Sequence, residues 1–323
     1  MLSSLGRYQV DQLLARGGMG EVYLGRVLGT HDFVRPVVIK VIRTELVENE
    51  RIALMFVDEA RIAAGLHHRN IVQILDFDLF EAGAFLVTEY IPGCDLRALL
   101  HYLRGAPPFE IAIAVLAELA TGLDAAHDAR DTEGAPLGLI HRDVSPGNVL
   151  LGVHGEVKIA DFGIAKARSR SYHTMSGSIK GKAPYMAPEQ ILGEPIDRRA
   201  DVFSLGVLLF ELSTRSRLYS AYGNAIAMKH ILDGTLPDPA ERRPDYPPAL
   251  TQIVRRALAR HPADRYPTAR AFADALDDLA RAERWNLSAA QIAEQVRLVR
   301  KRIEIATTTP LWQSLQAPGG TPA

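Results

Sequence analysis

The stretch that decides the fold is residues 140–151, which read I-H-R-D-V-S-P-G-N-V-L-L. Apolar residues lead into and out of a charged turn, a pattern that predicts two short strands holding a rigid loop. The turn carries a carboxylate, Asp143, and five residues later an amide, Asn148. Together these groups can orient an attacking hydroxyl and hold a metal ion beside it. Further on, Asp161-Phe162-Gly163 adds a second carboxylate next to a glycine.

The two motifs together resemble the H-R-D-x-x-x-x-N and D-F-G pair of protein kinases. Either motif alone is a weak signal, but both at this spacing are specific. The resemblance implies that Asp143 orients the substrate hydroxyl. It also implies that Asn148 and Asp161 hold Mg²⁺ against the phosphates of ATP.

Composition sets few limits on function. The chain has 323 residues, 47% of them hydrophobic and 23% charged, which is ordinary for a soluble globular protein. The net charge of −1 favours neither a nucleic acid nor an anionic membrane as partner. A single cysteine, Cys94, excludes an internal disulfide framework and indicates a reducing compartment. No signal peptide and no apolar run long enough to span a bilayer is visible, so a cytoplasmic protein is expected.

The N-terminal part reads as two strands, residues 8–26, joined by a glycine-rich turn. Glycines let a backbone approach phosphate groups closely. The turn resembles the kinase G-x-G-x-x-G-x-V loop, although an alanine replaces its first glycine. The residues that would bind the nucleotide here are Ala15, Gly17, Gly18, Gly20 and Val22.

A β-branched run at residues 37–42 contains one lysine, Lys40, and a charge in such a strand implies a buried partner. Residues 49–66 have helical periodicity, and Glu59 lies on their apolar face. The pair resembles the kinase strand lysine and helix glutamate, so Lys40 is expected to hold the phosphates and Glu59 to orient Lys40. A surface salt bridge is the alternative. Val38 replaces the usual alanine and would crowd the adenine slot slightly.

The segment 88–95, T-E-Y-I-P-G-C-D, resembles the hinge between the two kinase lobes. Thr88 would be a small gatekeeper, and the backbone of Glu89 and Ile91 would bind adenine. Asp95 would lie near the ribose or a basic substrate residue. Leu150, after the catalytic turn, would form the floor of the adenine pocket.

One departure from the family pattern concerns a cation. Ser145 stands where most serine/threonine kinases have a lysine, whereas Lys182 stands where they have a threonine. In the resembling fold these positions face each other across the catalytic acid. The hypothesis is a positional swap in which Lys182 supplies the cation and Ser145 the hydroxyl. The alternative is that Lys182 points to solvent.

Residues 161–189 resemble an activation segment that ends in Ala187-Pro188-Glu189, and Arg265 is the expected partner of Glu189. Its polar middle offers several hydroxyls, so autophosphorylation is expected there, with Arg142 receiving the phosphate. An unmodified loop is the alternative. The nearly all-apolar residues 201–213 predict a buried helix, with Asp201 as its N-cap and as an anchor of the catalytic loop.

Near the C-terminus, Ser288 and Gln291 form a capping-box pattern. The helix after them carries Ile292, Val296 and Val299 on one face, expected to pack on the large lobe rather than bind a partner. Two amphipathic helices are expected within residues 249–282. Residues 307–323, rich in Thr, Pro and Gly, have a composition typical of disorder.

The expected fold is α+β: a two-lobed protein kinase fold with a small, mostly antiparallel β lobe and a larger helical lobe. Residues 1–7 would be a lead, 8–91 and 92–281 the two lobes, and 282–323 a helix and tail. The motif style resembles bacterial eukaryote-like (Hanks-type) serine/threonine kinases.

Such an enzyme would use ATP and Mg²⁺, act on protein substrates and allow a homodimer for autophosphorylation. A non-catalytic nucleotide-binding scaffold and a small-molecule phosphotransferase of related fold are the alternatives.

Overall fold

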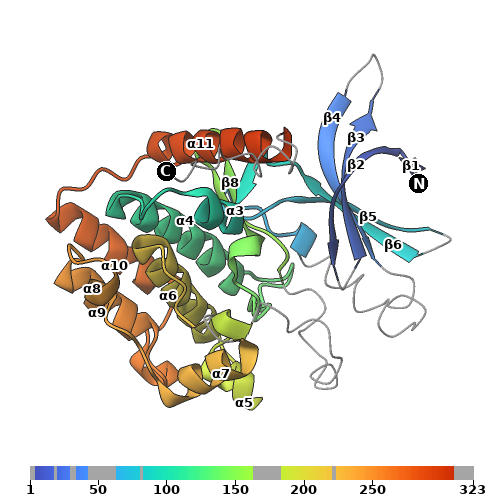
Figure 1. Ribbon diagram of the computed structural model, residues 1–323. Coiled ribbons are helices and arrows are strands. Elements are labelled where there is room, and N and C mark those ends of the chain that lie inside the picture. The colour runs from blue at the N-terminus through green and yellow to red at the C-terminus, as the bar shows by residue number, and fades with distance from the viewer. Residues whose placement is uncertain are drawn as a thin grey trace, which may run out of the picture.

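The computed structural model describes residues 4–17, 20–29, 34–42, 63–80, 83–162, 183–219 and 223–308. It has two lobes, a curled sheet and a larger helical body (Figure 1). The predicted two-lobed α+β fold is confirmed.

The small lobe is one antiparallel sheet with the strand order β1-β2-β3-β4-β6-β5. Its strands are β1 (Ser4–Leu5), β2 (Tyr8–Gly17), β3 (Gly20–Leu28), β4 (Val34–Ile42), β5 (Ile74–Phe80) and β6 (Gly83–Glu89). Along β4 the side chains alternate between the two faces of the sheet, because neighbouring residues of a strand point to opposite faces. Val37 and Ile39 are buried in the lobe's core, whereas Lys40 lies on the other face. The strands predicted from the glycine-rich turn and the lysine run are therefore confirmed.

A second, three-stranded sheet lies at the junction of the lobes. It consists of β7 (Gly93–Asp95), β8 (Val149–Gly152) and β9 (Val157–Ile159) in that order. Since β7 forms the end of the hinge segment 88–95 and β8 follows the catalytic turn, this sheet joins the two candidate halves of the site. Its buried members, among them Val149 and Ile159, belong to the core of the large lobe.

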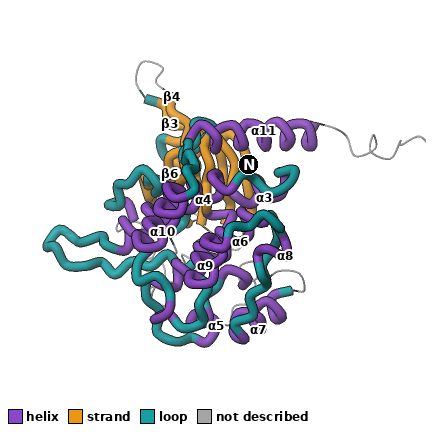
Figure 2. Tube along the Cα trace, turned by 90° about the vertical axis from the view of Figure 1, so that its left-hand side faces the viewer, coloured by secondary structure: helices purple, strands orange, loops and turns teal. Residues whose placement is uncertain are grey.

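Helices form the large lobe around a buried centre (Figures 1 and 2). They are α3 (Leu96–Tyr102), α4 (Phe109–His127), α5 (Pro188–Leu192), α6 (Arg199–Thr214), α7 (Asn224–Asp233), α8 (Pro239–Arg242), α9 (Pro248–Ala257) and α10 (Ala269–Ala282). Short 3₁₀ turns are η1 (Pro146–Asn148), η3 (Ala183–Tyr185) and η4 (Pro262–Asp264). Helix α6 is buried on all sides, as its apolar sequence predicts, and packs against α4 and α9. The two predicted amphipathic helices correspond to α9 and α10.

Helix α11 (Ala289–Thr308) lies along α3, β7 and β8 (Figure 1). Ile292, Val296 and Val299 are buried against the large lobe, as the sequence predicts. The capping box is only half formed: the Ser288 hydroxyl accepts from the backbone of Ala290. Among the described residues the buried side-chain oxygen of Gln291 has no hydrogen-bond partner, so the second bond of the capping box is missing.

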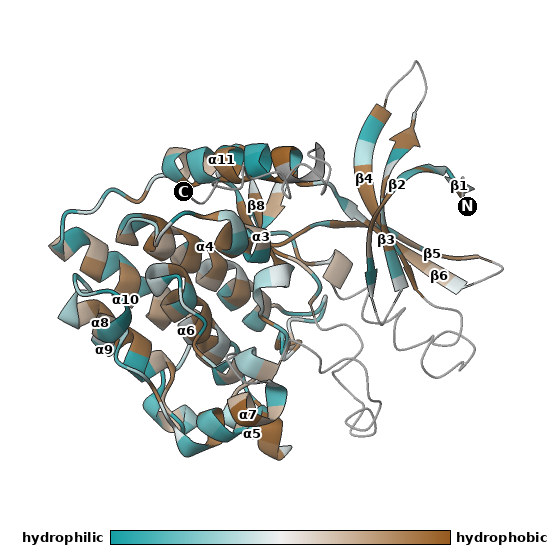
Figure 3. Cartoon of the chain, viewed as in Figure 1, coloured by the Kyte–Doolittle hydropathy of each residue, from teal (hydrophilic) through white to brown (hydrophobic). Residues whose placement is uncertain are grey.

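Figure 3, which colours the chain by hydropathy, shows hydrophilic and hydrophobic residues mixed along the ribbon of α11. The tail beyond residue 308 and most of the predicted helix at residues 49–66 lie outside the described residues; of that helix only residues 63–66 are described, and residues 63 and 64 are helical.

Candidate active site

The catalytic turn is held by a carboxylate from α6 and not by two strands. A strand, β8, follows the turn as predicted, but residues 139–145 before it form no regular element. Arg142 has a left-handed backbone (φ 63°), which interrupts strand geometry. The backbone N–H groups of His141 and Arg142 donate to the two oxygens of Asp201, each at 2.8 Å. The prediction of a leading strand is therefore wrong, because these N–H groups bond to a side chain instead of to a neighbouring strand.

Asp201 is an anchor of this turn and does not cap α6. Helix α6 begins at Arg199, and its N-cap is Arg198, which makes no side-chain capping bond. Asp201 is buried and also contacts His127 Nε2 at 2.7 Å. Burial alone would raise the pKa of Asp201, but the hydrogen bonds and charges of its partners outweigh burial, so the pKa lies below its usual range. The predicted N-cap role is wrong, and the predicted anchoring of the loop is confirmed.

His141 is a packed structural residue. Its ring is fully buried and lies 4.7 Å from the ring of Phe162, centroid to centroid. The backbone N–H of Asp143 donates to His141 Nδ1 at 3.2 Å, and Nε2 lies 3.0 Å from the carbonyl oxygen of Ala160. This pattern requires a neutral ring with its proton on Nε2, and burial lowers the pKa of His141 accordingly.

Asp143 and Asn148 lie on the same turn, as the motif predicts. Asn148 Nδ2 donates to the carbonyl oxygen of Asp143 at 2.8 Å, which fixes the amide orientation and keeps its oxygen as an acceptor. The backbone N–H of Asn148 donates to the carbonyl oxygen of Ser145, and the carbonyl oxygen of Asn148 accepts from the N–H of Ala160. Ser145 is buried, and its side chain makes no capping bond to η1. Lys182 lies outside the described residues.

The side chains of Lys40 and Asp161 meet across the two lobes. Lys40 Nζ lies 2.9 Å from Asp161 Oδ1, although the residues are 121 positions apart. Asp161 has a left-handed backbone (φ 55°), an unusual conformation for a residue that is not glycine. Glu59, the partner predicted for Lys40, lies outside the described residues. Within the described part of the chain the partner is Asp161, whose side chain is 47% exposed, so it is not the buried partner that the sequence predicts.

Strand pairing brings the nucleotide-binding candidates of the small lobe side by side. Ala15 pairs with Val22, and Val22 pairs in turn with Lys40, so the three residues are lateral neighbours. Gly17 pairs with Gly20 at the end of the hairpin, and Gly18 lies outside the described residues. Gly20 has a φ of +150°, and a Cβ there would lie 1.8 Å from the carbonyl oxygen of Val41. Only glycine fits at that position.

The hinge candidates lie at the end of β6. Thr88 pairs with Val38 of β4, so these two candidates for the adenine slot are lateral neighbours. The backbone N–H of Glu89 donates to the carbonyl of Gln73, and the Thr88 hydroxyl donates to the Glu89 carbonyl at 3.3 Å. Ile91 follows the strand and is half-buried.

Lys158 forms an ion pair that was not expected from the sequence. Its Nζ lies 2.8 Å from Glu89 Oε1, and the same oxygen accepts from the backbone N–H of Gln73. Lys158 thereby ties the hinge to β9, the strand that leads to Asp161. The signal was present in the sequence: a lone lysine between Val157 and Ile159 is the same pattern that marks Lys40.

Asp95 and Leu150 are neighbours in the junction sheet. Asp95 is the N-cap of α3: its Oδ1 accepts from the backbone of Ala98 at 2.7 Å, and its Oδ2 lies 3.3 Å from Arg97. Leu150 is half-buried between the fully buried Val149 and Leu151. Burial raises the pKa of Cys94 to about 12, so its thiol is a poor nucleophile.

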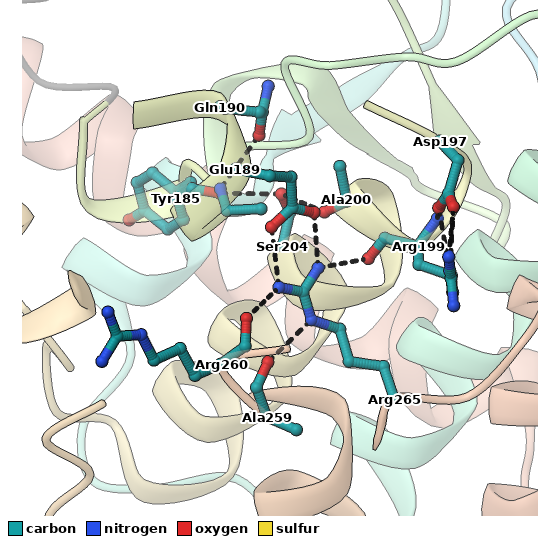
Figure 4. A network of polar contacts seen from close by, with 11 residues as sticks. Tyr185, Glu189, Gln190, Asp197, Arg199, Ala200, Ser204, Ala259, Arg260 and Arg265 are labelled. Atoms are coloured by element: carbon teal, nitrogen blue, oxygen red, sulfur yellow. Dashed lines mark hydrogen bonds and ion pairs between the residues drawn. The ribbon is translucent and has the colours of Figure 1, made fainter. Parts of the chain in front are cut away.

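A buried ion pair holds the end of the predicted activation segment (Figure 4). Arg265 makes two parallel contacts with Glu189, at 2.6 and 2.8 Å, as the sequence predicts. Arg265 also donates to the backbone carbonyls of Arg199, Ala259 and Arg260. The pair therefore fixes α5 against α6 and the turn before α10. Residues 163–182, which hold the candidate phosphorylation sites, lie outside the described residues.

The geometry agrees with a comparison against protein families, in which a model of the protein kinase domain matches residues 8–276. The chain belongs to the protein kinase domain family. The predicted resemblance to bacterial eukaryote-like kinases is confirmed by relatives and by solved kinase domains. Members of this family use ATP and typically a divalent metal ion.

Among the relatives, the tyrosine-protein kinase MasK of Myxococcus xanthus is 44% identical over 280 residues, which cover 86% of this chain and 43% of MasK. The serine/threonine-protein kinase PknB of Mycolicibacterium smegmatis is 36% identical over 270 residues, which cover 81% of this chain and 41% of PknB. The kinase domain thus spans about two fifths of the length of these relatives.

The crystal structure of the Mycobacterium tuberculosis PknI kinase domain is 28% identical to this chain, with a TM-score of 0.64. The match covers 86% of this chain and 98% of that structure. Among the described residues, no helix is long and apolar enough to cross a membrane.

Proposed function

We propose that this kinase domain transfers the γ-phosphoryl group of ATP to serine or threonine hydroxyls of proteins. The observation that carries the proposal is the contact of Lys40 with Asp161, because it brings the small-lobe cation to the carboxylate of the large lobe. The catalytic turn supplies the remaining groups, Asp143 and Asn148. Phosphoryl transfer needs mostly positioning and charge neutralisation, which these groups can provide.

The donor set fits Mg²⁺. A carboxylate on Asp161 and an amide oxygen on Asn148 are hard oxygen ligands, and magnesium in such sites takes its other ligands from phosphates and water. In the described part of the chain no cluster of three or more His, Cys, Asp or Glu side chains could hold a metal by itself. Bound there, Mg²⁺ would neutralise charge on the phosphates.

Each remaining residue has a proposed part. Lys40 would bind the α- and β-phosphates, oriented by Glu59, and Asp143 would orient the acceptor hydroxyl. The glycine-rich hairpin would cover the phosphates with Ala15, Gly17, Gly18, Gly20 and Val22. Val38, Thr88, Glu89, Ile91, Asp95 and Leu150 would line the pocket for adenosine. Lys182 and Ser145 would share the cation and hydroxyl roles by the proposed swap.

Two alternatives are weaker. A small-molecule phosphotransferase would not need the fixed end of the activation segment, which the Arg265–Glu189 pair holds as a platform for a peptide. A non-catalytic scaffold would not need Lys40, Asp143, Asn148 and Asp161 together. The name of MasK makes tyrosine a candidate acceptor as well, and the test below separates it from serine and threonine.

The test is mass spectrometry of the purified chain after incubation with Mg-ATP, with Asp143→Asn as the matched inactive variant. We expect phosphate on serine or threonine in the activation segment of the parent protein, none in Asp143→Asn, and none when EDTA removes the metal. Phosphotyrosine alone would reassign the acceptor. No incorporation on the chain or on any protein substrate, with ATP still bound, would favour the scaffold.

Lys182→Ala tests the swap: loss of about 10²-fold or more in kcat supports it, and near-parent turnover refutes it. A cytoplasmic location, which the single cysteine favours, and a homodimer for autophosphorylation also belong to this proposal.

A further inference from the structure

A cavity of about 740 Å³ lies between α3 and the C-terminal end of α6. Its charged lining consists of Asp95, Arg97, Glu211, Arg215 and Arg217. None of these side chains except Asp95 has a part in the proposed nucleotide site. The cavity therefore needs its own explanation.

The cavity adjoins the catalytic turn. A Cβ added to Gly147 would lie 2.3 Å from Arg97 Nη2, so the guanidinium of Arg97 rests directly on the turn between Asp143 and Asn148. At the other end, the Tyr185 hydroxyl contacts Glu211 and Arg217. Tyr185 belongs to η3, which lies near the end of the predicted activation segment. The cavity thus runs from the catalytic turn to the segment on which a protein substrate would lie.

Both carboxylates of the cavity are already engaged. Glu211 is 1% exposed: its Oε2 accepts from the Tyr185 hydroxyl at 2.8 Å and from Arg217 at 3.2 Å, and its Oε1 accepts from the backbone of Leu218. The oxygens of Asp95 are taken by the backbone of Ala98 and by Arg97, as described above. Each of these carboxylate oxygens thus already accepts a hydrogen bond from a described residue. A basic side chain entering the cavity would have to compete with those donors.

The guanidinium groups, in contrast, retain donors that face solvent. The side chains of Arg97 and Arg217 are 65% and 47% exposed, and each contacts its carboxylate through a single nitrogen out of three. Arg215 is exposed at the end of α6 and makes no ion pair with any residue that the structure describes. The cavity is lined by three arginines and two carboxylates, and both carboxylates are already engaged. The remaining positive charge and N–H donors favour an anionic ligand.

We propose that this cavity binds an acidic side chain, a carboxylate or a phosphate, of a protein substrate close to its acceptor hydroxyl. The inference deepens the proposed function and rests on it, because the ligand is part of the substrate of the same site. Arg215 and Arg97 would determine specificity, whereas Arg217 also neutralises the buried Glu211. For that reason Arg217 is unsuitable as a first test: its loss would leave a buried charge unpaired.

The test uses the full chain and peptides with one serine acceptor. A single variable position, moved along both sides of the serine, holds alanine, glutamate, phosphoserine or arginine. We expect glutamate at one or two adjacent positions to raise kcat/KM about fivefold over alanine, as for one exposed ion pair, and arginine to lower it. A larger gain for phosphoserine than for glutamate would identify phosphate as the preferred source of the charge.

Arg215→Glu should reverse the preference at those positions from glutamate to arginine. Arg284→Glu is the matched control, since Arg284 is another exposed arginine with a left-handed backbone (φ 59°) just after a helix. It should leave the preference unchanged. Equal rates for all peptides, or a preference that survives Arg215→Glu, would overturn the proposal.

Binding of the same peptides, measured by fluorescence anisotropy, separates the two proposals. Turnover without any acidic preference keeps the kinase function and overturns the cavity assignment. Acidic preference in binding without turnover contradicts the kinase function and keeps the assignment. Equal binding and no turnover would overturn both.

Discussion

At the scale of single residues, the site depends on polar groups that are buried with partners from distant parts of the chain. Arg265 is fully buried with Glu189, and Asp201 with His127 and the catalytic turn. Burial makes the removal of one partner costly, because the other charge then stays in a medium of low polarity.

Arg265→Met should lower the free energy of unfolding by about 3–5 kcal/mol, since it leaves Glu189 buried and unpaired. Adding Glu189→Leu should recover part of that loss, because no buried charge then remains. Arg281→Met is the control: Arg281 pairs with Asp278 at the surface, and such a pair contributes about 0–1 kcal/mol. Urea unfolding measures all three. Equal losses for Arg265→Met and Arg281→Met would contradict the prediction.

Stability should fall in mild acid because of His141. Burial lowers its pKa in the folded protein, against the opposing charges of Asp201, Asp143 and Asp161. The folded state therefore binds its proton less readily than the unfolded chain, whose pKa is about 6.5. This contribution is fully present above about pH 6.5 and is lost as the pH falls toward the folded-state pKa. Protonated Nδ1 could no longer accept from the backbone of Asp143.

The measurement is the melting temperature between about pH 7.5 and pH 5, bracketing the ordinary histidine pKa. His141→Gln should be less stable at neutral pH but show a flatter pH dependence, since glutamine does not titrate. His154→Gln, at an exposed histidine, should keep the parent profile. The lowered pKa of Asp201 acts in the same direction at lower pH. An unchanged slope in His141→Gln would refute the assignment.

At the scale of elements, two glycines of the glycine-rich hairpin differ in the space around them. Gly20→Ala should lower the melting temperature and raise KM for ATP, because its Cβ would collide with the Val41 backbone of the strand that carries Lys40. The strain should cost about 1–3 kcal/mol. Gly17→Ala is the matched control, since the nearest atom to its Cβ is 4.0 Å away. Similar effects of both variants on stability would contradict this account.

Helix α11 lies beyond the residues matched by the family model and yet is part of the large-lobe core. Val296→Asp should cost more than about 3 kcal/mol, because it buries an unpaired charge against the hinge side of the lobe. Leu298→Asp lies on the same helix but is 42% exposed, so its effect should stay within about 1 kcal/mol. Chemical unfolding compares the two. Equal losses of stability in the two variants would mean that α11 does not pack on the large lobe in solution.

At the scale of the whole molecule, the two lobes differ in the size of their cores. Among the described residues, the small-lobe cluster has six fully buried members, from Leu5 to Val87, whereas the large-lobe cluster runs through α4, α6, α9, α10 and α11. Local stability follows buried contact. We expect amides of β2 to β6 to exchange faster than those of α4 and α6 in native-state hydrogen exchange. Equal protection in both lobes would contradict this expectation.

The sequence by itself determined the order of the motifs and, through them, the fold. Lys40, Asp143, Asn148 and Asp161 were identified because the motifs around them resemble those of protein kinases, and such motifs extend over only a few positions. The bounds predicted for helix α6, residues 201–213, were also close to those observed, Arg199–Thr214. A nearly continuous apolar run is enough for such an element, because it predicts a helix that is buried on all sides.

Only the tertiary structure decided which polar groups meet. The contact of Lys40 with Asp161, the bonds from the catalytic turn to Asp201, and the link from Lys158 to Glu89 all join distant segments. The same holds for the arginines around Glu211. A single charge in a strand shows that a partner is needed, but which partner it finds depends on how the lobes pack. Burying a charge without a partner is costly, and no local pattern records which distant group will supply that partner.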